Sequence, residues 1–234
     1  EIRLSLVGSE MCIRDRGLMD QALALEILHA GQNVMLTGPA GAGKTYVLNQ
    51  FIQQAKSDSK HVSVTATTGL AATHIGGNTI HAWSGIGVSD ELPDDFEDYL
   101  LKSRRDIIET TDVLIIDEIS MLHDFRLDMV DTVARTVRDD PRPFGGIQVV
   151  LCGDFFQLPP VNRDSGRQGG FVTSSKAWQD LDLVICYLNE QHRQDDAEFL
   201  GILNALRAGD IRRRHAEAPV SYTHLRAHET KANL

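Results

Sequence analysis

Residues 33–45 read NVMLTGPAGAGKT, and this stretch decides the fold. Its first five residues, with the apolar Val34, Met35 and Leu36 at their centre, predict a buried strand. The following segment, Gly38 to Thr45, fits the pattern GxxxxGK[ST], and a helical pattern runs on from Lys44 to about Lys56. Strand, glycine-rich loop and helix in this order predict a phosphate-binding loop, against the alternative of a chance glycine turn.

The residue types of this loop suit a nucleotide. Backbone N–H groups can turn inward around phosphates, Lys44 can reach the β and γ phosphates, and Thr45 can offer its hydroxyl to Mg²⁺. The candidate nucleotide-binding residues of the loop are Gly38, Pro39, Ala40, Gly41, Ala42, Gly43, Lys44 and Thr45.

Further strand and helix patterns alternate on both sides of the loop. Besides 33–37, strands are predicted at 61–65, 113–117, 147–152 and 183–187, and helices at 18–30, 68–75, 125–138 and 197–208. This alternation predicts an α/β fold with a central, mostly parallel sheet flanked by helices. The acidic stretch 89–98 has no strand character, and we expect a small solvated insertion at about 86–110.

Two carboxylates end the apolar strand at 113–117 in the sequence VLIIDE. Ligands of open α/β sheets bind at the carboxyl ends of the strands, so these side chains are expected beside the phosphate loop. Asp117 suits the shell of a Mg²⁺ ion, and Glu118 suits a base that polarises an attacking water. The alternative is a solvated pair that merely caps the strand.

A third motif, CGDFFQLPPV at 152–161, also follows an apolar strand. Its Gln157 is expected to bond the γ-phosphate and the attacking water, and the alternative is a surface glutamine in a proline turn. Pro159 and Pro160 are expected to end the strand sharply and to stiffen the loop, because proline fixes φ and lacks an N–H donor.

The composition excludes several classes of protein. The chain has 234 residues, 42% of them apolar, and no run of about 18 apolar residues that could cross a bilayer. Three cysteines without CxxC spacing predict neither a zinc site nor a disulfide framework, and they favour a reducing cytoplasm. The net charge of −10 argues against a general basic coat but leaves room for a local nucleic-acid groove.

The two ends match no element of this pattern. Residues 1–16 and 219–234 resemble translated sequencing-adaptor read-through, and we expect them to be non-native. A signal peptide is the alternative for 1–16, but that stretch lacks a sustained apolar core and a cleavage site. The predicted domain is therefore 17–210, with 211–218 as its uncertain edge.

Five motifs in order carry a resemblance to a known family. They are GPAGAGKT (38–45), TATTGLAATHIGGNTIHAWSGIG (65–87), LIIDEISML (114–122), GDFFQLPPV (153–161) and LNEQHRQ (188–194). Together they resemble the Pif-type DNA helicases, relatives of RecD in superfamily 1. The resemblance implies the first RecA-like P-loop NTPase domain of a motor that hydrolyses Mg-ATP and moves 5′ to 3′ along single-stranded DNA. It also implies work in DNA repair, recombination or telomere maintenance, in the nucleus or mitochondrion if the source is eukaryotic.

Two nucleotide contacts are implied by the resemblance alone. Gln21 occupies the position of the family's glutamine that reads adenine, and a solvent-facing helical glutamine is the alternative. Arg193 occupies the position of an arginine that reaches the γ-phosphate, where it would stabilise charge on the transferring phosphoryl group. The alternative for Arg193 is an ordinary surface arginine.

The resemblance also implies two motifs that contact single-stranded DNA. Small hydroxyl and glycine residues in the first allow the backbone to meet phosphate. In the second, Trp83 is open to two interpretations, a base-stacking platform or a core residue, and His81 to a contact or a buried structural role. The candidate DNA-binding residues are Thr65, Thr67, Thr68, Gly69, Thr79, His81 and Trp83.

The family pattern continues into a second RecA-like domain that these 234 residues do not contain. We therefore expect the natural chain to be longer. Two rival functions stay open: an AAA-type ATPase that remodels protein, and a nucleotide-dependent binding module without turnover. The first predicts no GDFFQLPPV motif, and the second predicts loss of Glu118 or Gln157.

Overall fold

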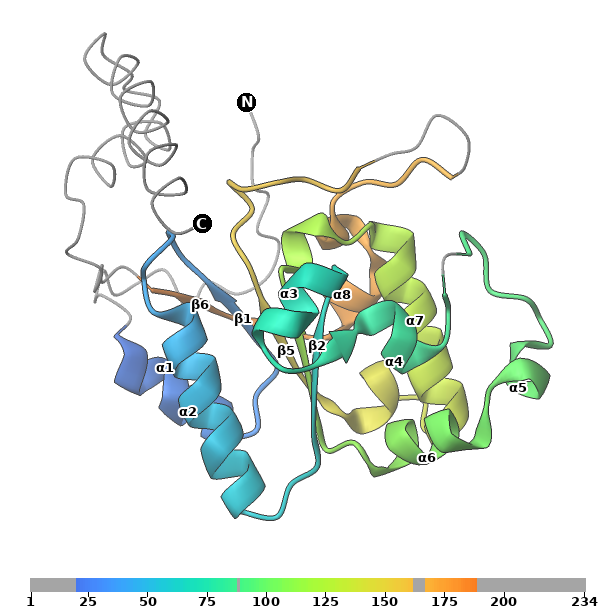
Figure 1. Ribbon diagram of the computed structural model, residues 1–234, viewed down its shortest axis with the longest axis horizontal. Coiled ribbons are helices and arrows are strands. Elements are labelled where there is room, and N and C mark those ends of the chain that lie inside the picture. Colours follow the sequence, from blue (N-terminus) through green and yellow to red (C-terminus); the bar gives the residue numbers. More distant parts are fainter. Residues whose placement is uncertain (1–19, 88, 162–166, 189–234) are drawn as a thin grey trace, which may run out of the picture. The chain divides into compact units, whose positions relative to one another are not determined.

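The computed structural model describes residues 20–87, 89–161 and 167–188, which form a six-stranded sheet with all neighbouring strands parallel. The order across the sheet is β3-β2-β4-β5-β1-β6 (Figure 1). The predicted α/β fold is thereby confirmed. The strands are β1 (Val34–Thr37), β2 (Val62–Ala66), β3 (Asn78–Thr79), β4 (Val113–Asp117), β5 (Gln148–Cys152) and β6 (Val184–Tyr187).

Helices connect the strands, and four of them match predicted ones: α1 (Gln21–His29), α2 (Lys44–Ser57), α3 (Gly69–His74) and α7 (Asp124–Arg138). The predicted helix at 197–208 lies outside the described residues. None of the helices in the described ranges is long and apolar enough to cross a membrane. The described helices that were not predicted are α4 (Ile80–Ser84), α5 (Phe96–Tyr99), α6 (Lys102–Thr110) and α8 (Lys176–Asp180). There are also 3₁₀ turns, η1 (Ile119–Met121), η2 (Pro143–Gly146) and η3 (Val172–Ser174).

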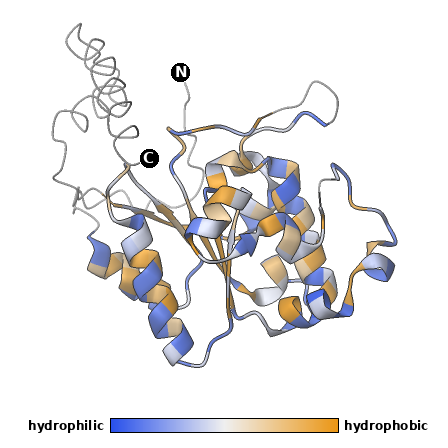
Figure 2. Ribbon diagram, in the orientation of Figure 1, coloured by the Kyte–Doolittle hydropathy of each residue, from blue (hydrophilic) through white to orange (hydrophobic). Residues whose placement is uncertain are grey.

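Both faces of the sheet are apolar, because successive side chains of a strand point to opposite faces. In β1, Val34 and Leu36 pack with α1 and α2, whereas Met35 packs on the opposite face with α4, α6 and α7. The same alternation holds along β4 and β5. Figure 2 shows the strands and the inward sides of the helices as hydrophobic. Two separate cores therefore hold the sheet rigid from both sides.

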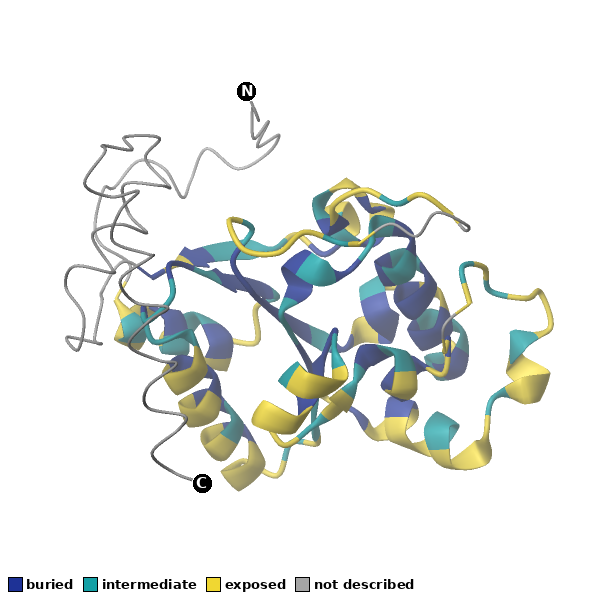
Figure 3. Ribbon diagram, turned by 45° about the horizontal axis from the view of Figure 1, so that its top comes forward, coloured by how far each residue is buried: buried dark blue, intermediate teal, exposed yellow. Residues whose placement is uncertain are grey.

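The insertion between α4 and β4 is more ordered than its acidity predicts. Leu92, Phe96 and Leu100 pack against the core, while α6 buries Ile108 beside α7. The acidic residues of this segment lie mostly at the surface, where Figure 3 shows α5 as largely exposed. The segment is thus an insertion with an apolar inner side, on which Leu92, Phe96 and Leu100 recur every four residues.

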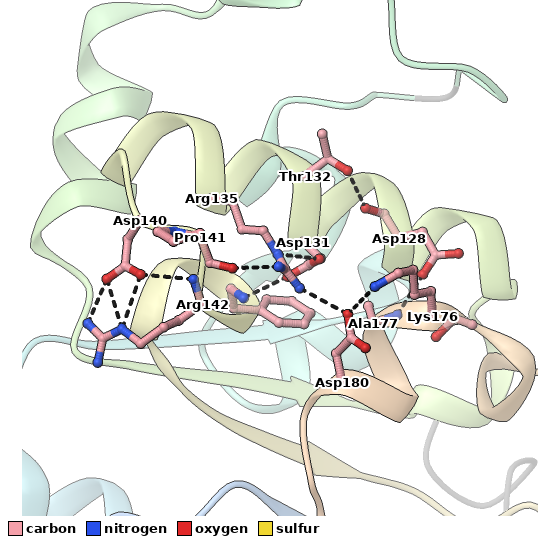
Figure 4. Close-up of polar contacts among 12 residues, drawn as sticks. Asp128, Asp131, Thr132, Arg135, Asp140, Pro141, Arg142, Lys176, Ala177 and Asp180 are labelled. Carbon is pink, nitrogen blue, oxygen red and sulfur yellow. Dashed lines mark hydrogen bonds and ion pairs between the residues drawn. The ribbon is translucent and has the colours of Figure 1, made fainter.

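Polar contacts tie α7 to η2 and α8 (Figure 4). The buried Asp131 accepts hydrogen bonds from Arg135 Nε (2.8 Å) and from the backbone N–H of Phe144 (2.6 Å). Arg135 also contacts Asp180, which Lys176 neutralises from within α8. Each buried polar group here has a partner, as burial demands.

Candidate functional site

The phosphate loop joins β1 to α2. Gly43 is the N-cap of α2 with φ 88°, a left-handed conformation that glycine adopts without steric cost. Gly38 has φ 143°, and a Cβ on it would collide with the carbonyl oxygen of Leu188, directly after β6. The glycines at these two positions therefore let the loop turn tightly against its neighbouring strand.

Two side chains of the predicted nucleotide site contact this loop. Lys44 Nζ donates to the carbonyl oxygens of Gly38 (2.8 Å) and Pro39 (3.1 Å), so its ammonium lies across the loop. Gln21 Nε2 donates to the carbonyl oxygen of Ala42 (3.3 Å), which places this half-buried side chain against the loop rather than free in solvent. Thr45 is exposed in the first turn of α2.

The carboxylate pair lies at the same edge of the sheet as the loop. In the parallel register, Leu36 of β1 pairs with Cys152 of β5, and Leu151 pairs with Ile116 of β4. The carboxyl ends of β1, β5 and β4 therefore lie next to one another.

Charge interactions link the carboxylates to the loop. Burial raises the pKa of the Glu118 carboxyl, Asp117 and Asp154 raise this pKa further, and Lys44 opposes them. A carboxyl whose pKa is raised in this way is a stronger base once it is ionised. The Cys152 thiol is fully buried, and burial together with a hydrogen bond to Asp117 raises its pKa well above the ordinary value. The thiol therefore stays protonated.

Glu118 has an unusual backbone. Its φ of 53° and ψ of 40° place it in the left-handed region, which costs a residue with a Cβ on the order of 1 kcal/mol. Its N–H donates to Asp117 Oδ1 (2.9 Å), and its carbonyl accepts the N–H of Met121 (3.1 Å) and the hydroxyl of Thr67 (3.0 Å). Nothing in the sequence pattern signalled this conformation.

The sequence interpretation overlooked Asp154, which is 3% exposed. Its Oδ1 accepts the N–H of Phe156 (3.0 Å), and its Oδ2 accepts Gln157 Nε2 at a long 3.4 Å. Asp154 thus holds the turn that carries the exposed Gln157. An aspartate directly after the glycine that follows an apolar strand was the available signal.

The expectation that Pro159 and Pro160 end the strand is wrong. β5 ends at Cys152, well before either proline. The turn at Gly153 and Asp154 ends it, since Gln157 N–H bonds back to the Asp154 carbonyl (3.0 Å).

Three of the seven candidate DNA-binding side chains are buried: Thr67, whose hydroxyl donates to the Glu118 carbonyl, and two others that lie deeper in the protein. Thr65 is 1% exposed and its hydroxyl donates to the Ile115 carbonyl (2.6 Å). Trp83 is 4% exposed within the core beside α7, which favours the core interpretation over a base-stacking platform. Both side chains are turned away from solvent, so neither offers a surface to DNA in this structure.

The other candidates lie at helix starts. Thr68 and Thr79 cap α3 and α4, accepting the N–H groups of Ala71 (3.2 Å) and Ala82 (3.1 Å). Gly69 is exposed, with open space where a Cβ would stand. These three positions can present backbone or hydroxyl groups to a phosphate chain.

His81 borders a pocket of about 270 Å³ that Thr68, His123, Arg126 and Val161 also line. Burial lowers the pKa of the imidazole, and the nearby Arg126 and His123 lower it further. The imidazole is therefore neutral at pH 7. His81 is half-buried, which lies between the two interpretations of an exposed DNA contact and a buried structural residue. The last candidate, Arg193, lies outside the described residues, as do both ends of the chain.

The model of the PIF1-like helicase family matches residues 12–217. Over 185 residues the chain is 52% identical to the ATP-dependent DNA helicase Pif1 of Psychrobacter sp., covering 77% of this chain and 28% of that protein. It is 41% identical over 197 residues to the ATP-dependent DNA helicase PIF1 of Saccharomyces cerevisiae, covering 82% of this chain and 23% of the relative. The chain thus spans about a quarter of the length of these relatives.

Solved structures give the same result. The crystal structure of Pif1 helicase from Candida albicans superposes with a TM-score of 0.78 at 37% identity, covering 85% of this chain and 45% of that one. Bacteroides Pif1 bound to ssDNA superposes with a TM-score of 0.74 at 33% identity, covering 86% and 48%. The RecA-like fold expected from the sequence is therefore confirmed.

Proposed function

The chain belongs to the PIF1-like helicase family, and on that basis we propose that it is the ATP-binding motor domain of a helicase that moves 5′ to 3′ along single-stranded DNA. The observation that carries the proposal is the convergence of Lys44, Asp117 and Glu118 at one edge of the sheet. A phosphate-binding cation, a metal-binding carboxylate and a base are the groups that phosphoryl transfer to water requires.

Nucleotide binding would rearrange the loop. The Lys44 ammonium now bonds two loop carbonyls, and we propose that it exchanges them for the β and γ phosphates. The N-terminus of α2 would add its dipole to the same phosphates. Gln21, already against the loop, would present the rest of its amide to adenine.

Asp117 and Thr45 are the residues we propose to hold Mg²⁺. Among the described residues no cluster of three or more His, Cys, Asp or Glu side chains could hold a metal by itself. A carboxylate and a hydroxyl beside a triphosphate fit Mg²⁺, which usually takes one or two protein carboxylates and completes its shell with phosphates and water. When bound, the ion would neutralise charge on the phosphates.

The hydrolytic step would fall to Glu118, which we propose orients the attacking water and accepts its proton. Gln157, tethered by Asp154, would bond the same water or the γ-phosphate. Arg193 would add positive charge to the transferring group, as the resemblance implies.

Single-stranded DNA would pass over the starts of α3 and α4, at Thr68, Gly69, Thr79 and His81. The solved structure of a relative bound to ssDNA supports DNA as the partner. The backbone of Thr67 would contribute to DNA binding by placing the turn that carries Thr68 and Gly69. The side chains of Thr65 and Trp83 are buried, so they would support this DNA-binding surface from within the core and would not contact DNA themselves.

The rest of the motor would lie on a second RecA-like domain. The much greater length of the relatives supports a longer natural chain. We propose that the whole protein serves DNA repair, recombination or telomere maintenance, in the bacterial cytoplasm or in the nucleus or mitochondrion of a eukaryote. The match to a helicase family disfavours a protein remodeller, and the presence of both Glu118 and Gln157 disfavours a module without turnover.

The proposal is tested by ATP hydrolysis and strand separation in the natural-length protein. We expect oligo(dT) to stimulate hydrolysis, and a duplex with a 5′ single-stranded tail to be unwound in preference to one with a 3′ tail. The 234-residue chain should bind ATP but turn over far more slowly, because an arginine finger from another domain is worth about 10³ to 10⁵ in rate. Hydrolysis indifferent to DNA in the natural-length protein would refute the helicase assignment.

A further inference from the structure

One threonine connects the carboxylate pair to the segment proposed to meet DNA. Thr67 directly follows β2 and is 9% exposed. Its N–H donates to the carbonyl of Asp117 (3.2 Å), and its hydroxyl donates to the carbonyl of Glu118 (3.0 Å). Since Ala66 pairs with Asp117 in the register, Thr67 extends the ladder by one residue and thereby holds two successive peptide units of the site.

The hydroxyl bond matters because of the conformation of Glu118. A left-handed residue with a Cβ persists only where its surroundings fix it. The other partner of the Glu118 carbonyl, the N–H of Met121, belongs to the same 3₁₀ turn. Among the described residues, Thr67 is thus the hydrogen-bond donor that ties this carbonyl to a different element of the fold. Loss of its hydroxyl would leave the peptide after Glu118 freer to rotate.

The residues that follow Thr67 face outward. Thr68 caps α3 through the N–H of Ala71, and Gly69 has open space above it. A DNA backbone that binds to this turn would therefore displace Thr67, the residue that holds Glu118. One peptide bond joins Thr67, which bonds the Glu118 carbonyl, to Thr68, which caps α3.

We propose that Thr67 is a positioning residue for ATP hydrolysis. Its hydroxyl holds Glu118 in its left-handed conformation, so that a movement of the turn at 68–69 changes the position of the Glu118 carboxylate. The inference rests on the proposed function, because it assigns Glu118 to the hydrolytic step. Thr67 itself would touch neither nucleotide nor the attacking water.

The test compares Thr67→Val, which removes the hydroxyl at nearly constant shape, with Thr67→Ser, which keeps it. In the natural-length protein with saturating oligo(dT), we expect Thr67→Val to lower kcat by about 10- to 100-fold, as for a misplaced catalytic group. The KM for ATP and the Kd for oligo(dT) should stay within about twofold, because the lost interaction acts in the transition state. Thr67→Ser should restore most of kcat.

Ser63→Ala is the matched control. Ser63 lies earlier on β2, and its hydroxyl bonds that of Thr111 (2.8 Å) at the end of α6, so the variant removes a hydroxyl bond of β2 that does not involve Glu118. It should leave kcat unchanged. Equal losses in Ser63→Ala and Thr67→Val would reveal general damage to the sheet and overturn the proposal. So would a normal kcat in Thr67→Val, a change in Kd or KM alone, or failure of Thr67→Ser to rescue.

Thermal unfolding of each variant shows whether it folds, and Thr67→Ala replaces Thr67→Val if the latter does not. The proposed function has its own readouts, hydrolysis by the unmodified protein and its loss in Glu118→Gln. If both behave as expected and Thr67→Val is silent, only the role of Thr67 fails. If the unmodified protein does not hydrolyse ATP, the proposed function fails first.

Discussion

The edge that carries the phosphate loop and the segment that runs through β2, α3 and α4 use their polar residues differently. At the loop edge, Lys44 and Thr45 begin α2 and Gln157 lies in the loop after β5, and the side chains of Thr45 and Gln157 are exposed. Along the other segment, Thr65 and Trp83 point into the protein, and Thr68 and Thr79 bond to their own helices. A nucleotide site needs particular side chains, whereas a sequence-independent DNA track can be built from backbone and short hydroxyls.

The largest effect is expected when Glu118, the proposed base at the loop edge, is replaced. Glu118→Gln keeps shape and hydrogen bonding but not basicity, so hydrolysis should fall by about 10² to 10⁴. ATP affinity, measured by a fluorescent analogue, should persist. The exposed Glu109→Gln on α6 is the control and should hydrolyse normally. Equal rates for Glu118→Gln and the unmodified protein would remove Glu118 from the mechanism.

Trp83 tests the other region. As a core residue, Trp83→Ala should destabilise the protein by about 3 to 5 kcal/mol, the usual cost of truncating a buried aromatic side chain. Urea unfolding measures this loss. Trp83→Phe should cost less, because Trp83 Nε1 has no hydrogen-bond partner within the described residues. If Trp83→Phe retained full stability but lost oligo(dT) affinity, the base-stacking interpretation would return.

Lys44 sharpens the distinction between binding and turnover. Lys44→Ala removes a charge-assisted contact worth about 1.5 to 3 kcal/mol, so ATP affinity should fall by roughly 10- to 100-fold. Equilibrium titration with the fluorescent analogue checks this. Lys56→Ala, at the exposed end of the same helix, should bind as tightly as the unmodified protein. Equal affinities in the two variants would show that the loop lysine does not meet phosphate.

The smallest effect concerns His81. Because burial, Arg126 and His123 lower its folded pKa below the unfolded value of 6.5, the unfolded chain binds the proton more readily. Stability should therefore fall as the pH drops below about 6.5, and His81→Gln should flatten part of this slope. Urea midpoints between pH 7 and pH 5 measure it. An unchanged slope in His81→Gln would place the imidazole in water.

The strands and the loop could be predicted because their signals are local. The apolar run at 113–117 and the glycines at 38–43 each determine their own conformation, and the structure agrees with both to within a residue. The order of the strands and the short helices α4, α5 and α8 could not be predicted, since long-range packing and capping decide them.

The same difference separates the residue roles that were found from those that were overlooked. Lys44 and Glu118 belong to motifs that the chemistry of phosphate requires. Asp154 acts by holding a turn, and Thr67 acts on a carbonyl that lies 51 positions further along the chain. Pairing of β2 with β4 gives Thr67 this contact, so no spacing within one motif indicates it.

The order of the strands in the sheet also determines when, during translation, β1 can gain its neighbouring strands. Val34 of β1 is flanked in the sheet by Val150 of β5 and Val184 of β6. At about 5 to 20 residues per second, a ribosome needs on the order of ten seconds or more to supply those neighbours. The phosphate loop is thus translated well before both of its supporting strands. A nascent chain should become able to retain ATP only after β6 has left the exit tunnel.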